Sequence, residues 1–364
     1  MHILDTSPTE AALSSVGVDL GGTSIRVGLF DPAMRLLGSR QMKTLVAEGP
    51  DAAVRRIAAA IDELVATHVL AGSKASIQGI GIGSPGPIDL REGILGELPN
   101  LPGWGAFPLR AALAAATGLE VVLESDANAA AIAEWKLGAG SKADVDSMGM
   151  ITLGTGVGSG FILNGEVWHG IRGMGGEVGH SSVELHGALC GCGTRGCLEL
   201  YASAGGLKRL ARDVSTSSQG TEALQALISG ANGFSAADVG ALALSGDRAA
   251  QLAFERFGFY LGLGVANVIN TLDLPMILIG GGVADSWNLF APAMFETVRT
   301  YSQIYRLVEP SQTVVLESDR TFIGPAALGP VAGLLGAGLL PRLAGRTGMS
   351  RRNEDISRLA NGFD

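Results

Sequence analysis

Three cysteines and one histidine lie close enough in the sequence to bind a single metal ion. Cys190, Cys192 and Cys197 are the only cysteines of the 364-residue chain and fall within CGCGTRGC, and His180 lies ten residues upstream of the first. The glycines between them let the backbone turn tightly. Three thiolates and one imidazole form the closed tetrahedral shell in which proteins hold Zn²⁺ as a structural ion. We therefore predict a structural zinc site.

A disulfide with one spare thiol is the alternative for these cysteines. A bridge between Cys190 and Cys192 would be strained at that spacing, and an odd number of cysteines fits a secreted disulfide framework poorly. Reduced cysteines committed to a metal are typical of the cytoplasm, which is where we expect the protein to act.

Two carboxylates flank the proposed metal loop. Glu177 lies in GMGGEVGH before it, and Glu199 follows the last cysteine by two residues. Carboxylates held by a rigid loop would accept hydrogen bonds from a polyhydroxylated ligand. The spacing equally allows Glu177 to cap a turn and Glu199 to be a solvated residue at the start of a helix.

Glycine turns that follow apolar runs could bind phosphate groups. Glycine supplies 54 residues, about 15% of the chain against roughly 7% in an average protein. Alternating apolar residues over 16–31 predict two antiparallel strands joined at Gly21 and Gly22. Asp19 could hold Mg²⁺ or its bound water, and the N–H groups of Gly21, Gly22 and Thr23 could bind phosphate, although a plain hairpin would have the same sequence.

A second hairpin of the same design is predicted over 148–167, with its turn at Gly154, Thr155 and Gly156 and its return strand at 160–163. Two matching hairpins suggest a duplicated scaffold with two lobes. A third glycine run follows a strand and precedes a helix without forming G-x-G-x-x-G, which favours a shelf for a nucleotide base over a dinucleotide fold. This run consists of Gly280, Gly281 and Gly282.

An acidic residue lies at a predicted corner between a strand at 121–125 and an alanine-rich helix at 128–137. Asp126 would then sit at the carboxyl end of a strand, where open α/β folds place their chemistry. It could instead be the N-cap of the helix. We expect Trp104, in the turn-rich loop 98–109, to be exposed beside the same site.

The composition indicates a compact protein of two domains, since 47% of the residues are hydrophobic and 17% are charged. No apolar run reaches about 18 residues without a glycine or polar interruption, and the N-terminal segment lacks the basic region of a signal peptide. The net charge of −9 argues against a broad nucleic-acid surface. We therefore expect small-molecule partners, with neither nucleic acid nor membrane.

These motifs together resemble the ROK family of sugar kinases and sugar-responsive repressors, over about residues 16–340. The resemblance implies an α/β protein with the two-lobed, actin-like ATPase or hexokinase-type fold, in which sugar and ATP meet in the interdomain cleft. The smaller lobe would comprise residues 1–126 with a C-terminal helix near 326–340, the larger lobe 127–325, and a loose tail 341–364. The shared motifs are DLGGT (19–23), NLPGW (100–104), DANAAA (126–131), LGTGVGSG (153–160), GGEVGH (175–180) and CGCGTRGCLE (190–199).

The resemblance also implies roles for individual residues. Asp126 would be the catalytic base. Glu177, His180 and Glu199 would bind the sugar, with His180 also ligating zinc through its other ring nitrogen, and Asn100 is expected on the sugar side. The phosphates and Mg²⁺ would be served by Asp19, Gly21, Gly22, Thr23, Gly154, Thr155 and Gly156, and the nucleotide base would be bordered by Gly280, Gly281 and Gly282.

One position departs from the family pattern. The family usually has Asn before the catalytic Asp, where it donates to a sugar hydroxyl, O3, whereas this chain has Ser125. Either a water molecule bridges the shorter serine to the sugar, or the substrate differs at that hydroxyl.

The resemblance implies an ATP-dependent kinase that phosphorylates a hexose at O6, with glucose as the first expectation. The alternatives are an N-acetylmannosamine, N-acetylglucosamine or fructose kinase and, more distantly, a sugar-responsive regulator without catalysis. A repressor would need a DNA-binding helix-turn-helix ahead of the first strand, where only about 15 residues stand. We expect a homodimer or homotetramer that uses ATP, Mg²⁺ and structural Zn²⁺.

Overall fold

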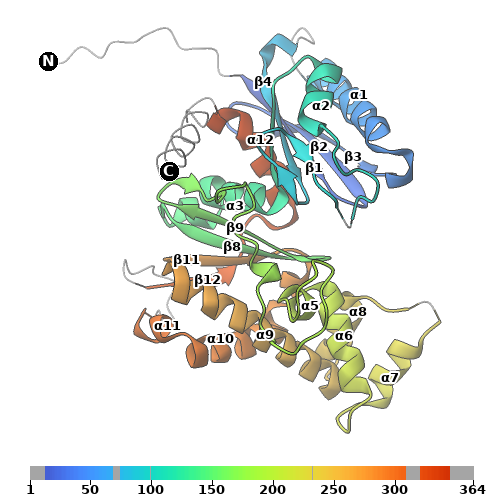
Figure 1. The fold of residues 1–364 in the computed structure, drawn as a ribbon, viewed down its shortest axis with the longest axis vertical. Helices are drawn as coiled ribbons and strands as arrows, with labels where there is room; N and C mark the ends of the chain where they lie inside the picture. The colour runs from blue at the N-terminus through green and yellow to red at the C-terminus, as the bar shows by residue number, and fades with distance from the viewer. Residues whose placement is uncertain (1–12, 69–73, 99, 232, 309–319, 345–364) are drawn as a thin grey trace, which may run out of the picture. The chain divides into compact units, whose positions relative to one another are not determined.

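The computed structural model describes residues 13–68, 74–98, 100–231, 233–308 and 320–344. The chain forms two compact units (Figure 1). Unit 1 runs to Ala130 and resumes at Gly333, and unit 2 spans Ala131–Ala332. The expected lobe boundaries at 126 and 325 lie a few residues before these points, and most of the expected tail lies outside the described residues.

Unit 1 is built on a mixed sheet with the strand order β3-β2-β1-β4-β7. β1 pairs antiparallel with β2 and parallel with β4, and β4 pairs parallel with β7. The predicted hairpin around Gly21 and Gly22 is therefore confirmed. The strands are β1 (Ser14–Leu20), β2 (Ser24–Phe30), β3 (Leu36–Lys43), β4 (Ile77–Ser84) and β7 (Val121–Ser125), and a separate hairpin consists of β5 (Ile88–Asp89) and β6 (Ile94–Leu95).

The two faces of this sheet pack against different helices. Val16 and Val18 of β1 point to one face, where they join the core formed with α1 and α2. Gly17 points to the other face, where α12 comes so close that a Cβ would lie 2.7 Å from the backbone nitrogen of Gly338. The helices of unit 1 are α1 (Pro50–His68), α2 (Leu109–Thr117) and α12 (Ala332–Ala344).

α12 starts later than expected and continues past Pro341, where we expected a loose tail to begin. Pro341 is buried, and its carbonyl accepts a hydrogen bond from Gln78 Nε2 at 3.3 Å. Arg342 donates to the carbonyl oxygens of Leu13 at 3.2 Å and Pro32 at 2.6 Å. These contacts within unit 1 outweigh the tendency of proline to end a helix.

Unit 2 repeats the design of unit 1. Its sheet has the order β10-β9-β8-β11-β12, in which β8 and β9 form an antiparallel hairpin and β11 runs parallel to β8 and β12. The predicted duplication is confirmed by this common strand order, although β9 begins three residues earlier than expected. The strands are β8 (Met148–Leu153), β9 (Val157–Leu163), β10 (Glu166–Val167), β11 (Met276–Gly280) and β12 (Phe322–Pro325).

The helices α5, α6, α8, α9 and α10 bury one face of this sheet in a large apolar core (Figure 1). α9 is long and apolar enough to cross a membrane by length and composition, but 61% of its apolar window is buried in the protein, so we interpret it as a core helix. The remaining elements are α3 (Asp126–Leu137), α4 (Ala139–Lys142), α5 (Glu199–Ala202), α6 (Ala204–Ser215), α7 (Glu222–Ser229), α8 (Ala236–Leu244), α9 (Arg248–Leu272), α10 (Trp287–Tyr301), α11 (Gln303–Val308) and the 3-10 turns η1 (Val46–Glu48), η3 (Lys74–Ser76), η4 (Val178–His180), η5 (Gly282–Ser286) and η6 (Gly329–Val331).

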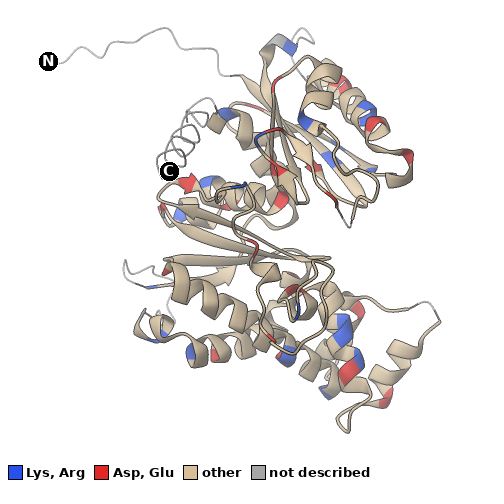
Figure 2. Cartoon of the chain, in the orientation of Figure 1, with Lys and Arg blue, Asp and Glu red and all other residues tan. Residues whose placement is uncertain are grey.

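Charged residues of both signs are interspersed along the outer helices (Figure 2). On α1, Arg56 pairs with Glu48 at 2.5 Å, and Glu63 of the same helix pairs with Arg40 of β3. Arg56 is half-buried, whereas Arg40 and Glu63 are exposed, and an exposed pair of this kind contributes little to stability.

Candidate functional site

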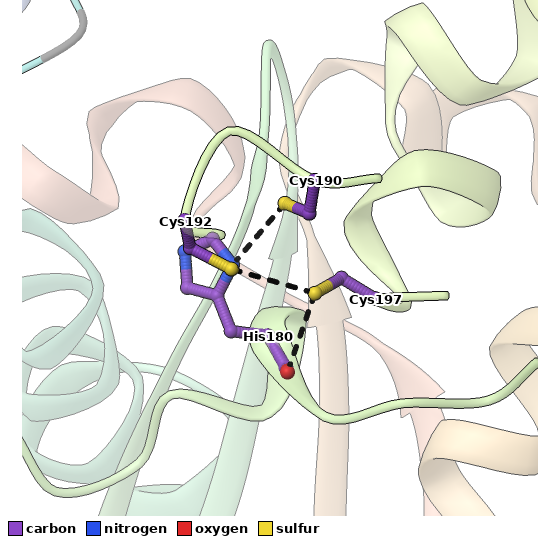
Figure 3. Close-up of side chains that lie close together, drawn as sticks. All are labelled: His180, Cys190, Cys192 and Cys197. Atoms are coloured by element: carbon purple, nitrogen blue, oxygen red, sulfur yellow. Dashed lines mark hydrogen bonds between the residues drawn. The ribbon is translucent and has the colours of Figure 1, made fainter. Parts of the chain in front are cut away.

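The structure brings the four predicted metal ligands together (Figure 3). The ligand atoms of His180, Cys190, Cys192 and Cys197 all lie within 4.8 Å of one another. Cys192 Sγ is 3.6 Å from Cys197 Sγ, and Cys190 Sγ is 3.8 Å from His180 Nδ1. Tetrahedral zinc with Zn–S bonds of about 2.3 Å separates its sulfurs by about 3.8 Å. All three cysteines are free thiols, so the disulfide alternative is wrong.

A short loop presents the cysteines to the histidine. Cys190 N donates to Thr194 O at 2.7 Å, which closes the turn between the first two cysteines and the third. Hydrogen bonds with Thr194 lower the pKa of the Cys192 thiol to about 6, whereas burial raises the pKa of Cys197 to about 11. A metal ion binds thiolates, so it would hold both cysteines deprotonated. The cluster thus has the spacing and the chemistry of a zinc site.

The flanking carboxylates lie beside this cluster in unit 2. Glu199 is half-buried, and its Oε2 accepts a hydrogen bond from Val157 N at 3.0 Å, so it is not a solvated helix start. Glu177 precedes η4 and makes no capping hydrogen bond with its side chain. Desolvation raises the pKa of Glu177, His180 opposes this shift, and Glu199 adds to it. These charges therefore act on one another at short range.

The corner between β7 and α3 carries the expected catalytic residue. Asp126 is exposed, and its Oδ1 accepts a hydrogen bond from Ala127 N at 2.7 Å. α3 begins at Asp126, two residues earlier than expected, because Ser125 is the residue that caps it: Ser125 Oγ accepts from Asn128 N at 3.1 Å. The side chain of Asp126 is thus not required as the N-cap of the helix.

A buried polar pair, which we did not predict from the sequence, supports this corner. Glu124 and Asn128 are 4% and 2% exposed. Glu124 Oε1 accepts from Ser125 N at 2.8 Å and from Asn128 Nδ2 at 2.9 Å. Among the described residues, Asn128 Oδ1 is buried without a hydrogen-bond partner. A glutamate inside an apolar strand and an asparagine inside an alanine-rich helix were the signals that could have revealed the pair.

The hairpin of unit 1 holds its expected phosphate residues in a defined turn. Gly21 N donates to Ser24 O at 3.0 Å, so this amide is engaged within the turn and Gly22 and Thr23 are the better candidates for a ligand. Asp19 Oδ2 accepts from Arg26 at 2.5 Å and 3.1 Å across the two strands. The carboxylate expected near Mg²⁺ is therefore oriented by an arginine.

The loop with Asn100 packs against the same hairpin. A Cβ at Gly22 would lie 2.7 Å from Asn100 O, so the two backbones are in close contact. Trp104 is only 1% exposed, and its Nε1 donates to Val46 O at 3.2 Å. Our expectation that Trp104 is exposed was wrong: the ring anchors the loop in the core of unit 1, and this leaves Asn100 exposed.

The glycine turns of unit 2 meet at one edge of its sheet. Because β8 and β11 are parallel neighbours, their carboxyl ends lie side by side. The turn of Gly154, Thr155 and Gly156 follows β8, and Gly280 ends β11. Gly281 has a φ of +87°, and a Cβ there would lie 2.5 Å from the carbonyl oxygen of the last residue of β8. Gly282 opens η5.

The sequence profile of the ROK family matches residues 15–342. The chain belongs to the ROK family. It is 36% identical over 327 residues to a glucokinase of Halalkalibacterium halodurans, which covers 89% of this chain and 94% of that protein. A crystal structure of a ROK family glucokinase from Streptomyces griseus in complex with glucose and AMPPNP superposes with a TM-score of 0.71 at 30% identity, over 91% of this chain and 99% of that chain.

More distant ROK relatives have other functions. A xylose repressor of Bacillus subtilis is 29% identical over 80% of this chain, but the match covers 70% of the repressor. The predicted α/β fold with two lobes is confirmed by the likeness to the ROK glucokinase structure. The His and Cys cluster is consistent with the zinc motif of the family.

We expect Asn128→Asp to destabilise this ROK protein by about 1 to 3 kcal/mol at pH 7, because a second carboxylate replaces the amide that donates to Glu124. Urea unfolding measures the change. The loss should shrink in acid, where a protonated carboxyl restores a donor. Asn267→Asp, at an exposed position of α9, is the matched control and should stay within about 0.5 kcal/mol of the wild type. Equal stability of Asn128→Asp and the control would contradict the role of the pair.

Proposed function

We propose that this protein is an ATP-dependent glucokinase, which transfers the γ-phosphate of ATP to O6 of glucose. The observation that carries the proposal is the likeness to a glucokinase over 94% of that relative's length, combined with an aspartate at the β7–α3 corner that is not needed to cap its helix. AMPPNP, bound in the Streptomyces griseus enzyme, is an analogue of ATP, which supports ATP as the donor.

Asp126 would act as the general base. Its carboxylate accepts the O6 proton as O6 attacks the γ-phosphorus in line; the O6–P bond forms, the bond from phosphorus to the β–γ bridging oxygen breaks, and ADP leaves. The exposed position of Asp126 at the carboxyl end of β7 supports this role. The buried pair of Glu124 and Asn128 would keep the corner rigid during the reaction.

The glycine turns would bind the phosphates of the nucleotide. Backbone N–H groups of Gly22 and Thr23 in unit 1, and of Thr155 and Gly156 in unit 2, can approach phosphate oxygens closely. Mg²⁺ is commonly held by one or two carboxylates together with the phosphates, which suits Asp19 in its pairing with Arg26. Gly280, Gly281 and Gly282 would border the base.

Glu177, His180 and Glu199 would bind the sugar hydroxyls, with Asn100 and Ser125 as further ligands. His180 turns Nδ1 toward Cys190, which leaves Nε2 as the nitrogen for the sugar. The four-residue cluster would hold structural Zn²⁺ and so fix His180 and the adjacent carboxylates. Assembly into a homodimer or homotetramer stays a prediction.

The alternative substrates are N-acetylmannosamine, N-acetylglucosamine and fructose. A panel of these sugars and glucose, assayed by coupled detection of ADP, tests the proposal. Glucose should have the highest kcat/KM, and a tenfold preference for another sugar would reject glucose as the substrate. No turnover with any sugar would instead favour a non-catalytic regulator.

We predict that Asp126→Asn folds normally and loses about 10²- to 10⁴-fold in kcat, because the amide cannot accept the hydroxyl proton. Steady-state kinetics with glucose and ATP measure the loss. Asp213→Asn, at an exposed carboxylate of α6, is the matched control and should keep the wild-type rate. Wild-type kcat in Asp126→Asn would show that the base is another residue.

We predict one zinc ion per chain, and a lower melting temperature with weaker glucose binding after chelation or in Cys192→Ser. The reason is that His180 and Glu199 belong to the loop that the metal closes. Elemental analysis, thermal unfolding and glucose titration measure these effects, and adding Zn²⁺ back should restore the chelated wild type but not the variant. Protein purified without chelator that contains no zinc would reject the site.

We predict that Ser125→Asn lowers the KM for glucose about two- to twelvefold, the range for one added hydrogen bond to a neutral hydroxyl. Asparagine caps helices as well as serine does, so α3 should not be weakened. The gain should vanish with 3-deoxyglucose, which lacks the O3 hydroxyl. Equal gains with both sugars would show that residue 125 does not contact O3, and a higher KM for glucose would indicate a pocket shaped for another sugar.

A further inference from the structure

The proposed phosphate turn of unit 2, residues 154–156, lies against the carboxylate of Glu199. Val157, the first residue of β9 after the turn, is buried, and its N–H donates to Glu199 Oε2 at 3.0 Å. A Cβ on Gly156 would overlap that same oxygen. The carboxylate of Glu199 therefore occupies the space beside Gly156 and receives the amide that follows it.

Two further contacts tie the turn to the segments that carry the proposed sugar ligands. Ala204 N, at the start of α6, donates to Gly154 O at 2.9 Å, so the segment from Glu199 to Ala204 is bonded to both ends of the turn. Gly179 of η4 lies against the carbonyl of Val157, where a Cβ would overlap it. Val157 is thus packed between η4 on one side and Glu199 on the other.

We propose that Glu199 is a positioning residue for the phosphate turn in addition to its role as a sugar ligand, and that a Cβ at residue 156 would have to displace its carboxylate. The inference rests on the proposed function. One carboxylate would then position both a sugar ligand and the turn at 154–156. A substitution in the turn should therefore alter glucose binding, and a substitution of Glu199 should alter the KM for ATP.

The hairpin supplies a matched pair of variants. In Gly156→Ala the new methyl group overlaps Oε2 of Glu199, whereas in Gly154→Ala it meets no atom within 4 Å. Neither glycine has a backbone conformation that excludes alanine. Both variants alter the same phosphate turn, and they differ in whether the added methyl displaces Glu199.

Glucose affinity measured by isothermal titration calorimetry without nucleotide separates the two cases. Gly156→Ala should raise the Kd for glucose about tenfold or more, because a displaced carboxylate loses a hydrogen bond from the sugar. Gly154→Ala should stay within about twofold of the wild type. Circular dichroism and thermal unfolding check that both variants are folded. Equal glucose affinities in the two variants would overturn the inference.

The reciprocal variant tests the same link from the sugar side. Glu199→Asp withdraws the carboxylate from Val157 and should raise the KM for ATP as well as the Kd for glucose. In the Glu199→Asp background, Gly156→Ala should weaken glucose binding less than it does in the wild type, since the overlap is relieved. An unchanged KM for ATP in Glu199→Asp, or full additivity of the two changes, would show that Glu199 is a sugar ligand only.

The two proposals fail in different ways. A wild-type protein that binds no glucose in the calorimeter would overturn the proposed function, and the inference with it. A wild-type protein that binds and phosphorylates glucose, but whose Gly156→Ala and Gly154→Ala variants behave alike, would overturn the inference alone.

Discussion

The short distances between His180 and three cysteine sulfurs are the constraint on which the site in unit 2 depends. They close the loop that begins at η4 and ends at α5, and Glu199 follows Cys197 by two residues. Loop residues ordinarily lose conformational freedom when they bind a ligand. A ligand shell that is already closed removes much of that cost, so the acidic residues around it have their geometry set before any ligand binds.

Alternating apolar residues and glycine turns were sufficient to predict the two hairpins and the bounds of β7. These signals are local, and each repeats over several residues. We could not predict in the same way that Ser125 caps α3 or that Glu124 pairs with Asn128. Each of these depends on a single hydrogen bond, and its contribution to stability comes from burial in the folded corner. Trp104 was misplaced for the same reason: its loop has the composition of a surface, and only packing in unit 1 shows that the ring is inside.

The high glycine content has a second cause besides the tight turns of the two hairpins. At Gly81 of β4 and Gly336 of α12, a Cβ would overlap a backbone oxygen of a neighbouring helix within unit 1. Glycines at such places let the backbone of α12 touch the backbones of β4 and α3. This role could not be predicted from the sequence, since the spacing of single glycines does not reveal which backbone they will face.

Unit 1 is discontinuous in the chain, and this has a consequence for synthesis on the ribosome. Its sheet is complete once β7 has emerged, but α12 packs against Gly17 and Gly81 only after all of unit 2, about 200 residues, has been made. At a typical elongation rate of about 5 to 20 residues per second, that interval lasts roughly 10 to 40 seconds. During it, the face of β1 and β4 that α12 later covers, which carries Ser15, Gly17 and Gly81, stays open, so the nascent chain exposes the backbone of this sheet to water until the last helix is made.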